Sequence, residues 1–466
     1  MCDDRSFVDD AADRGTGAGN AAAAAAALSR GSGSRSRCGR GSLGLSLSLR
    51  LAASRRVLLC KKEKQNWSEH SSFNDIAKHE APGDYNHPMR RRTFTGLLTA
   101  SLVRGFAKSD RVVIAGAGII GASIAYHLAR RGARVTILEK QRPGAGATQN
   151  SFAWINSFSK QPRSYYELNL LGIAGWRRWS TEIGDLRVQW GGSVQWQPPG
   201  AESEKLRKTV ARLEEWGYSA HLIDPAEIAT LTPGIAAGPS AAACFADQEG
   251  TVDPVEALGA VLKKAQAFGA KLEYPCEVTG ISTAGGRVRG VETSRGPMEA
   301  DYLVLAAGVD TARLAKMVEV NVPLKDSPGA LAHTRPCARM LDRLALAPGA
   351  NMKQNPDGRI VTGTDFGGSP VKDTSAAYGR ELLRNAAGFL PKLKDVELEY
   401  VTLGHRVLPV DDHPIVGFAP RCPNLYIAAM HSGITLSPLI GQVAATEILD
   451  GASVDLLRDY RPSRFA

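Results

Sequence analysis

Cysteines are few in this sequence, and long apolar runs are missing. The seven cysteines are scattered over 466 residues, and no two of them have C-x-x-C spacing. A zinc ribbon, a redox-active cysteine pair and a disulfide framework are therefore not indicated, and no metal site is expected. No run of eighteen apolar residues occurs, which argues against an integral membrane segment.

Acidic residues are too few in the first part of the chain to balance the basic ones. Residues 1–109 hold 18 Lys and Arg against 10 Asp and Glu, whereas residues 110–466 hold 39 against 37. Most of the net charge of +10 therefore belongs to the N-terminal segment. Because a basic surface is the usual electrostatic requirement for binding nucleic acid, we expect no nucleic-acid partner for the body of the protein.

Residues 1–109 are predicted to be a disordered or processed leader. The segment is rich in Ala, Ser, Gly and Arg, so it buries too little apolar surface to offset the entropy of ordering. A transit peptide is one interpretation, which the acidic start "MCDDRSFVDDAADR" does not favour. Another is a true start at Met89, where "MRRRTFTGLL" resembles a twin-arginine export signal. We expect a cytoplasmic protein, with export through such a signal as the alternative.

A complete dinucleotide-binding pattern begins at Arg111. The apolar run "RVVIAG" is typical of a buried parallel strand, and Gly116, Gly118 and Gly121 follow in G-x-G-x-x-G spacing. Such glycines permit a tight turn and let a pyrophosphate approach the amides at the start of the next helix. A second strand, "ARVTILE", ends in Glu139, whose carboxylate suits a ribose diol and would repel a 2′-phosphate. The pattern predicts an adenine dinucleotide.

Three later segments bear on the choice between NAD and FAD. The small, polar stretch 144–156 follows the second strand, so its backbone can lie against a cofactor. Residues 252–315 predict a helix with Val255 and Leu258 on its apolar face, two strands joined by a Gly-Gly turn, and a buried strand before Gly308. The stretch "NLYIAAMHSGITLSPLIGQVAATEILDG" predicts a strand, a glycine turn and a helix whose N-terminus can face a ring carbonyl.

In content and order these segments resemble the D-amino-acid oxidase superfamily of flavoproteins, which includes glycine and sarcosine oxidases. The resemblance extends over essentially all of residues 110–466. It implies an α/β fold in which a Rossmann-like FAD-binding domain is interleaved with an antiparallel-sheet substrate domain, with "RIVTGTDFGG" as one strand of that sheet. The implied boundaries are 110–190, 246–322 and 400–466 for the first domain and 191–245 and 323–399 for the second. NAD alone is the alternative, but it would not need the C-terminal segment.

The resemblance also implies which residues hold an extended FAD. The expected contacts are Gly116, Gly118, Ile119, Ile120, Gly121, Glu139 and Lys140 in the first βαβ unit, Ala147, Thr148, Phe152 and Ala153 after it, Val278 and Gly308 further along, and Gly433, Ile434, Thr435 and Leu436 at the last helix. Some relatives attach the flavin covalently. Since "GAGATQNSFAW" contains neither Cys nor His, we expect noncovalent FAD.

Arg406, in "GHRVLPVDDHP", is the candidate that binds the substrate carboxylate. A flavin needs little acid–base help to oxidise an amine, so the protein mainly supplies orientation and electrostatics. The planar fork of an arginine binds both oxygens of a carboxylate, and relatives often carry an arginine here. The alternative is a structural ion pair with Asp411 or Asp412.

His431 is the second catalytic candidate, because it precedes the turn expected to face the flavin. A lone histidine is more often a structural hydrogen-bonding residue, which is the alternative here. Tyr165 and Tyr166 are possible pocket residues, although neighbouring tyrosines on a helix more often serve in packing.

The sequence therefore predicts an FAD-dependent amino-acid or amine oxidase or dehydrogenase. The substrate would be a D-amino acid, glycine, sarcosine or a similar secondary amine, oxidised to an imine by hydride transfer to flavin N5. The electron acceptor would be oxygen or a carrier such as a quinone. The alternative is a flavoprotein without turnover that serves as an assembly or scaffold factor, since one fold can host many roles.

Overall fold

The computed structural model describes residues 106–107, 109–364 and 371–466. The expectations for the leader, including a start at Met89, therefore concern residues outside the described part. The same holds for the end of the strand expected in "RIVTGTDFGG".

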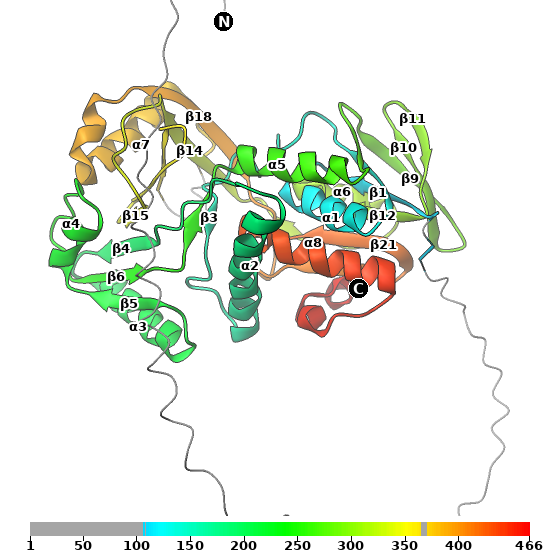
Figure 1. Ribbon diagram of the computed structural model, residues 1–466, viewed down its shortest axis with the longest axis horizontal. Helices are drawn as coiled ribbons and strands as arrows, with labels where there is room; N and C mark the ends of the chain where they lie inside the picture. Colours follow the sequence, from blue (N-terminus) through cyan, green and yellow to red (C-terminus); the bar gives the residue numbers. More distant parts are fainter. Residues whose placement is uncertain (1–105, 108, 365–370) are drawn as a thin grey trace, which may run out of the picture. The chain divides into compact units, whose positions relative to one another are not determined.

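The dinucleotide pattern lies in a six-stranded sheet (Figure 1). All neighbouring strands are parallel except β20, which pairs antiparallel with β21 at one edge. Strands that are buried on both faces need apolar side chains in both directions, and this explains the uninterrupted run "RVVIA". In spatial order the strands are β20 (Ile415–Ala419), β21 (Cys422–Ala429), β12 (Tyr302–Leu305), β1 (Arg111–Ala115), β2 (Arg134–Leu138) and β8 (Lys271–Glu273).

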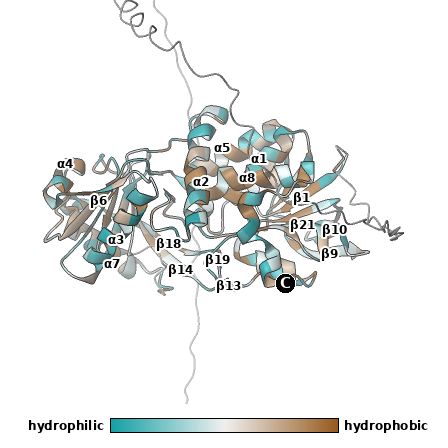
Figure 2. Ribbon diagram, turned by 90° about the horizontal axis from the view of Figure 1, so that it is seen from below, coloured by the Kyte–Doolittle hydropathy of each residue, from teal (hydrophilic) through white to brown (hydrophobic). Residues whose placement is uncertain are grey.

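Three helices cover one face of this sheet: α1 (Ile119–Arg130), α5 (Pro254–Ala267) and α8 (Gly433–Asp450). Side chains alternate along a strand, so Val112 and Ile114 pack beneath these helices. Figure 2 shows α8 as strongly hydrophobic, as a helix packed between a sheet and other helices must be. The expectation for α5 was wrong at one position, because Val255 is 49% exposed in the first turn of the helix.

The other face carries a three-stranded antiparallel sheet and a short helix. Val113 and Ala115 point to this side and pack in a second apolar cluster. The predicted Gly-Gly turn joins β9 to β10, with positive φ at both Gly285 and Gly286. The elements are β9 (Val278–Ala284), β10 (Arg287–Thr293), β11 (Gly296–Glu299) and α6 (Thr311–Lys316).

An eight-stranded sheet forms the second part of the fold. It is antiparallel except for one parallel pair, β15 with β4. Helix α7 (Ala376–Phe389) packs on one face around Trp196, and α3 (Ala201–Glu215) packs on the other. In spatial order the strands are β18 (Leu398–His405), β14 (Pro328–Thr334), β17 (Ile360–Gly363), β16 (Ala350–Gln354), β15 (Leu344–Ala347), β4 (Ser193–Gln197), β6 (Ala242–Ala246) and β5 (Ala220–Ile223).

Smaller elements complete the described part. Two short two-stranded pairs join β3 (Trp154–Ile155) with β7 (Gly250–Thr251) and β13 (Leu324–Lys325) with β19 (Leu408–Pro409). The remaining helices are α2 (Arg163–Glu182), α4 (Ile228–Leu231) and the 3-10 turns η1 (Pro225–Glu227), η2 (Gly308–Asp310), η3 (Pro391–Asp395), η4 (Asp455–Tyr460) and η5 (Pro462–Phe465).

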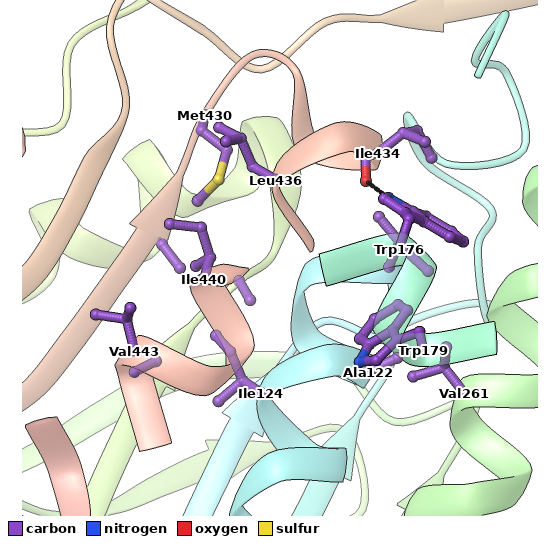
Figure 3. Packing of buried hydrophobic residues seen from close by; sticks show 14 of the residues in the cluster. Ala122, Ile124, Trp176, Trp179, Val261, Met430, Ile434, Leu436, Ile440 and Val443 are labelled. Atoms are coloured by element: carbon purple, nitrogen blue, oxygen red, sulfur yellow. Dashed lines mark hydrogen bonds between the residues drawn. The ribbon is translucent and has the colours of Figure 1, made fainter. Parts of the chain in front are cut away.

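Helix α2 fixes the start of α8. The indole Nε1 of Trp176 donates a 2.8 Å hydrogen bond to the carbonyl of Ile434, and Trp176 packs edge-on against Trp179 (Figure 3). A Cβ at Gly172 would lie 2.5 Å from the carbonyl oxygen of Thr435, so the two helices approach closely there. The first turn of α8 is thus held by buried contacts on the side away from the sheet.

The chain passes from the six-stranded to the eight-stranded sheet twice and returns twice. The crossings fall between β2 and β4, β6 and β8, β12 and β14, and β18 and β20. The fold is therefore the expected interleaved α/β arrangement, while the exact domain boundaries stay a prediction. Within the described ranges, no helix has both the length and the apolar character needed to cross a membrane.

Candidate active site and cofactor cradle

The glycine loop after β1 is shaped by close backbone contacts. Gly116 has a φ of +106°, and a Cβ there would lie 2.4 Å from the carbonyl oxygen of Ala306. A Cβ at Gly118 would lie 3.2 Å from Thr148 Oγ1, which accepts a hydrogen bond from Ile119 N at 3.1 Å. Because the glycines lack side chains, a ligand can closely approach the backbone at the start of α1, where Thr148 already accepts from the first amide.

Gly121 has a different position from the other two glycines. A Cβ on it would lie 2.0 Å from the carbonyl oxygen of Gly116, so its hydrogen lets α1 pack against the loop. It does not line the cavity described below, although we expected it among the cofactor contacts. Its place in the structure matches the packing role of the third glycine in such motifs.

Glu139 directly follows β2, and its carboxylate is held by two backbone amides. Oε2 accepts from Ala117 N and Oε1 from Gln141 N, both at 3.0 Å. A carboxylate has about four acceptor sites, so it can still accept hydroxyl protons from a ribose. The neighbouring Lys140 forms an ion pair with Asp310.

The turn between β21 and α8 carries the C-terminal candidates. Ser432 has a left-handed φ of 57°, which turns the chain so that α8 begins at Gly433. Thr435 Oγ1 accepts from Asn156 N at 3.3 Å and donates to the carbonyl of Trp154 at 3.3 Å. Leu436 is fully buried in the core beside Met430 (Figure 3) and does not line the cavity, contrary to our expectation of a cofactor contact.

A cavity of about 530 Å³ brings most of the expected residues together. It extends from the glycine loop to the start of α8 and reaches the eight-stranded sheet through residues such as Leu331 and Gly363. The sequence-predicted residues that line it are Gly116, Gly118, Ile119, Ile120, Glu139, Lys140, Ala147, Thr148, Phe152, Ala153, Val278, Gly308, Arg406, His431, Gly433, Ile434 and Thr435.

Arg406 lines this cavity directly after β18. Its Nη1 donates to the carbonyl of Pro328 at 3.2 Å. A Cβ at Gly329 would lie 2.7 Å from Nη2, so only a glycine there leaves room for the guanidinium. The carboxylates named as alternative partners are bonded elsewhere, Asp411 to Arg464 and Asp412 to Lys325, at 2.8 and 2.7 Å.

His431 lines the same cavity as a neutral imidazole. Burial, together with the charges of Lys160 and Arg406, lowers its pKa to about 3, while Asp412 acts weakly in the opposite direction. Its Nδ1 lies 3.4 Å from Ser432 Oγ, and that hydroxyl accepts from Tyr165 OH at 3.1 Å. At neutral pH this side chain can donate one hydrogen bond and accept another, but it carries no charge.

The two tyrosines on α2 lie close to the cavity without lining it. Burial raises the pKa of Tyr165 to about 12, so its hydroxyl stays protonated. Tyr166 is almost fully buried in the core, and its hydroxyl donates to the carbonyl of Trp216 at 3.2 Å. Tyr165 therefore contacts the turn before α8 through the hydroxyl of Ser432, and Tyr166 packs in the core.

Several lining residues were not anticipated from the sequence, among them Asn156, Lys160, Gln195 and Asn351. Lys160 lies in the turn between β3 and α2, Asn156 directly follows β3, and Gln195 and Asn351 lie in β4 and β16 of the eight-stranded sheet. No local pattern marks these positions, because only the folded chain brings them to one cavity. The charge of Lys160 within an otherwise uncharged stretch, "SFAWINSFSK", is the one available signal.

The residues present fit an FAD molecule. The glycines at 116 and 118 form a cradle that any Cβ would fill, at the open end of α1. At the other end of the cavity, the start of α8 at Gly433 and Ile434 lines the wall. The first amides of a helix offer N–H donors, and a ring carbonyl of a flavin can accept from them.

These features define the class of the protein. A βαβ unit with a glycine cradle, a carboxylate after its second strand and a second helix start on one cavity is the arrangement of a flavin-dependent oxidoreductase. A model of the FAD dependent oxidoreductase family matches residues 111–447, and the chain belongs to that family.

Three similar proteins align with this chain over more than nine tenths of their own lengths. One of the polypeptides of the opine oxidase of Agrobacterium tumefaciens is 29% identical over 76% of this chain and 97% of its own. Glycine oxidase of Pseudomonas aeruginosa is 28% identical over 71% and 92%, respectively. The crystal structure of glycine oxidase from Geobacillus kaustophilus has the same fold, with a TM-score of 0.71, 24% identity and coverage of 76% of this chain and 99% of that one.

Proposed function

We propose that this FAD-dependent enzyme oxidises the bond between carbon and nitrogen in an amino acid or secondary amine. The observation that carries the proposal is that Arg406 and His431 line the same cavity as the glycine cradle. The similarity to an opine oxidase polypeptide and to glycine oxidases supports it.

Arg406 would bind the carboxylate of the substrate. Its guanidinium offers paired N–H donors in a plane, which match the two oxygens of a carboxylate. The packing on Gly329 and the bond to the carbonyl of Pro328 fix the plane of the group. One fixed end reduces the orientations of the bound amine, and this positioning is a large part of the catalysis.

The electrostatics of the cavity favour the neutral amine that oxidation requires. Arg406 and Lys160 both place positive charge near His431, and His431 itself stays neutral. An ammonium ion would be repelled there, so the substrate binds as the free amine after losing a proton to solvent. When bound, FAD would supply the acceptor for a hydride from the carbon beside that nitrogen, and water would hydrolyse the resulting imine. Oxygen and a quinone-type carrier are both compatible acceptors for the electrons.

The test is anaerobic addition of matched amines to the purified holoenzyme. Glycine, sarcosine, D-alanine and D-proline each have a counterpart without the carboxylate, such as dimethylamine for sarcosine. We expect at least one carboxylated amine to bleach the flavin absorption band, and its counterpart to leave the band unchanged. If no carboxylated amine bleaches the flavin, the alternative of a flavoprotein without turnover is favoured.

We further propose that the FAD is held noncovalently. Acid precipitation should then release all of the flavin into the supernatant. Flavin absorbance that stays with the precipitated protein would contradict this.

A further inference from the structure

Lys160 brings to the cavity a cationic group whose one printed contact among the described residues is with an aromatic ring. The side chain is half-buried, and its Nζ lies 5.8 Å from the ring centroid of Tyr165. Among the described residues, Nζ forms no hydrogen bond and no ion pair. Since a shielded ammonium group loses hydration without gaining an acceptor, an anionic ligand would compensate that loss.

The turn that presents Lys160 is built by buried hydrogen bonds. Ser157 N donates to Tyr218 OH at 3.0 Å, and Ser157 Oγ donates to the carbonyl of Tyr166 at 2.7 Å. Ser159 has a positive φ of 58°, which is uncommon for a residue other than glycine. A backbone held this firmly keeps Lys160 at the cavity wall.

Glu249, the buried carboxylate whose charge acts on Lys160, is already engaged by neutral donors. It accepts from Trp154 Nε1 at 2.7 Å and from the hydroxyls of Ser193 and Tyr218, both at 2.6 Å. Burial raises the pKa of Glu249 to about 7, and the charge of Lys160 opposes that shift. Glu249 therefore balances the charge of Lys160 from a distance without capping its ammonium group.

Two cations consequently face one end of the cavity. Arg406 alone is enough to bind one carboxylate of a substrate, so the positive charge of Lys160 has no part in binding that carboxylate. Burial lowers the pKa of Lys160 to about 8, so the group is still mostly protonated at pH 7. A mostly protonated ammonium group at the cavity wall can act as a charge partner for an anion.

We propose that Lys160 binds a second carboxylate, so that the preferred substrate is a secondary amine with a carboxylate on each of its two arms. This inference rests on the proposed function, because Arg406 must hold the first carboxylate. Lys160 is then a specificity-determining residue on the opposite side of the reacting nitrogen.

The test compares two amines that differ by one carboxylate, iminodiacetate and sarcosine. We expect wild-type enzyme to prefer iminodiacetate in kcat/KM. In Lys160→Met, which keeps the length of the side chain without its charge, the ratio of the two kcat/KM values should fall at least tenfold, mainly through the KM for iminodiacetate. Lys160→Arg should retain most of the preference.

A binding measurement separates this inference from the proposed function. Thiodiacetate and (methylthio)acetate are matched acids without an oxidisable nitrogen, and their binding can be followed by the shift of the flavin absorption band. We expect thiodiacetate to bind at least tenfold more tightly to wild-type enzyme, and this advantage to vanish in Lys160→Met. This comparison remains valid even if neither amine is oxidised, an outcome that would count against the proposed function alone.

Two results would overturn the role of Lys160. One is a wild-type enzyme that binds the two sulfur acids equally. The other is a Lys160→Met variant with normal FAD content that keeps the wild-type ratio for both amines and both acids. If Lys160→Met fails to fold, the wild-type preference and the Lys160→Arg variant decide the question.

Discussion

Replacement of Gly116 by alanine should weaken both the fold and the binding of FAD. The new Cβ would lie 2.4 Å from the carbonyl oxygen of Ala306 and 2.8 Å from the Cα of Ala307, at the end of β12. Neither atom belongs to a flexible side chain, so the ends of β1 and β12 must move apart. The φ of +106° adds strain, because an L-residue with a side chain rarely adopts it.

The expected cost follows from these contacts. A backbone conformation of this kind costs about 1–3 kcal/mol in a residue other than glycine. Separation of the strand ends also weakens the hydrogen bonds from Gly116 N to Leu138 O and from Ala306 N to Ala115 O, at about 1 kcal/mol each. The free energy of unfolding should therefore fall by roughly 3–5 kcal/mol. With an unfolding entropy of about 2.1 cal/mol/K per residue over roughly 350 residues, Tm falls by about 4–7 °C.

Thermal unfolding of the apoproteins measures this cost, and fluorescence titration with FAD measures the affinity. We expect FAD to bind Gly116→Ala at least tenfold more weakly, because the amides after the loop are displaced with it. Gly146→Ala is the matched control for stability: Gly146 lines the same cavity, but a Cβ there has no atom within 4 Å. Its apoprotein should have the Tm of the wild type.

An unchanged Tm in Gly116→Ala, together with wild-type affinity for FAD, would refute the reasoning. Either the loop would then adjust at no cost, or the cradle would not be where the dinucleotide binds.

Three further predictions follow from single contacts. Arg406→Ala should keep its FAD but lose about 2–4 kcal/mol of transition-state binding, which is roughly 30- to 1000-fold in kcat/KM for a carboxylated amine. Arg406→Lys should recover part of this loss. Equal kcat/KM values in both variants and in the wild type would exclude the carboxylate contact. Burial lowers the pKa of His333 to about 4, so below pH 6.5 the unfolded chain takes up a proton that the native protein does not. The free energy of unfolding therefore falls as the pH drops from 6.5 to 4. Denaturant titrations of His333→Gln over this range should show a shallower fall. Arg461→Met should lower the free energy of unfolding by about 3–5 kcal/mol, because it leaves the buried carboxylate of Glu447 without its ion pair. Arg458→Met, at an exposed ion pair, should lower it by less than about 1 kcal/mol. Similar denaturation midpoints for the two variants would contradict this.

The cofactor end of the cavity could be predicted because its residues are neighbours in the sequence. Gly116, Gly118 and Glu139 belong to one βαβ unit, and the spacing of such a unit is set by the geometry of a turn and a helix. Gly433 and Thr435 follow the same logic at the start of α8. The sequence pattern did not separate residues that line the cavity from those that pack behind it, which is why Gly121 and Leu436 were included.

Apolar periodicity has a similar limit at the ends of helices. Leu258 is buried, as the helical pattern requires, but Val255 in the first turn of α5 is exposed although its neighbour Pro254 is buried, so Val255 lies beyond the edge of the covered face. Periodicity fixes the direction of a side chain and not the extent of the surface against which it packs. The roles of the predicted site residues and the domain boundaries stay predictions.

The residues at the substrate end of the cavity are far apart in the sequence, and the crossings between the sheets bring them together. Arg406 follows β18, at the point where the chain returns to the six-stranded sheet, and Lys160 lies between β3 and α2, on the way to the eight-stranded sheet. His431 joins them from the end of β21. None of the three belongs to the glycine cradle, so substitutions at the crossings can change the charge that meets the substrate while the cradle keeps its geometry. If the proposed roles of Arg406 and Lys160 hold, substrate preference is set where the chain passes between its two sheets, and the comparison of amines with one and two carboxylates tests both cations.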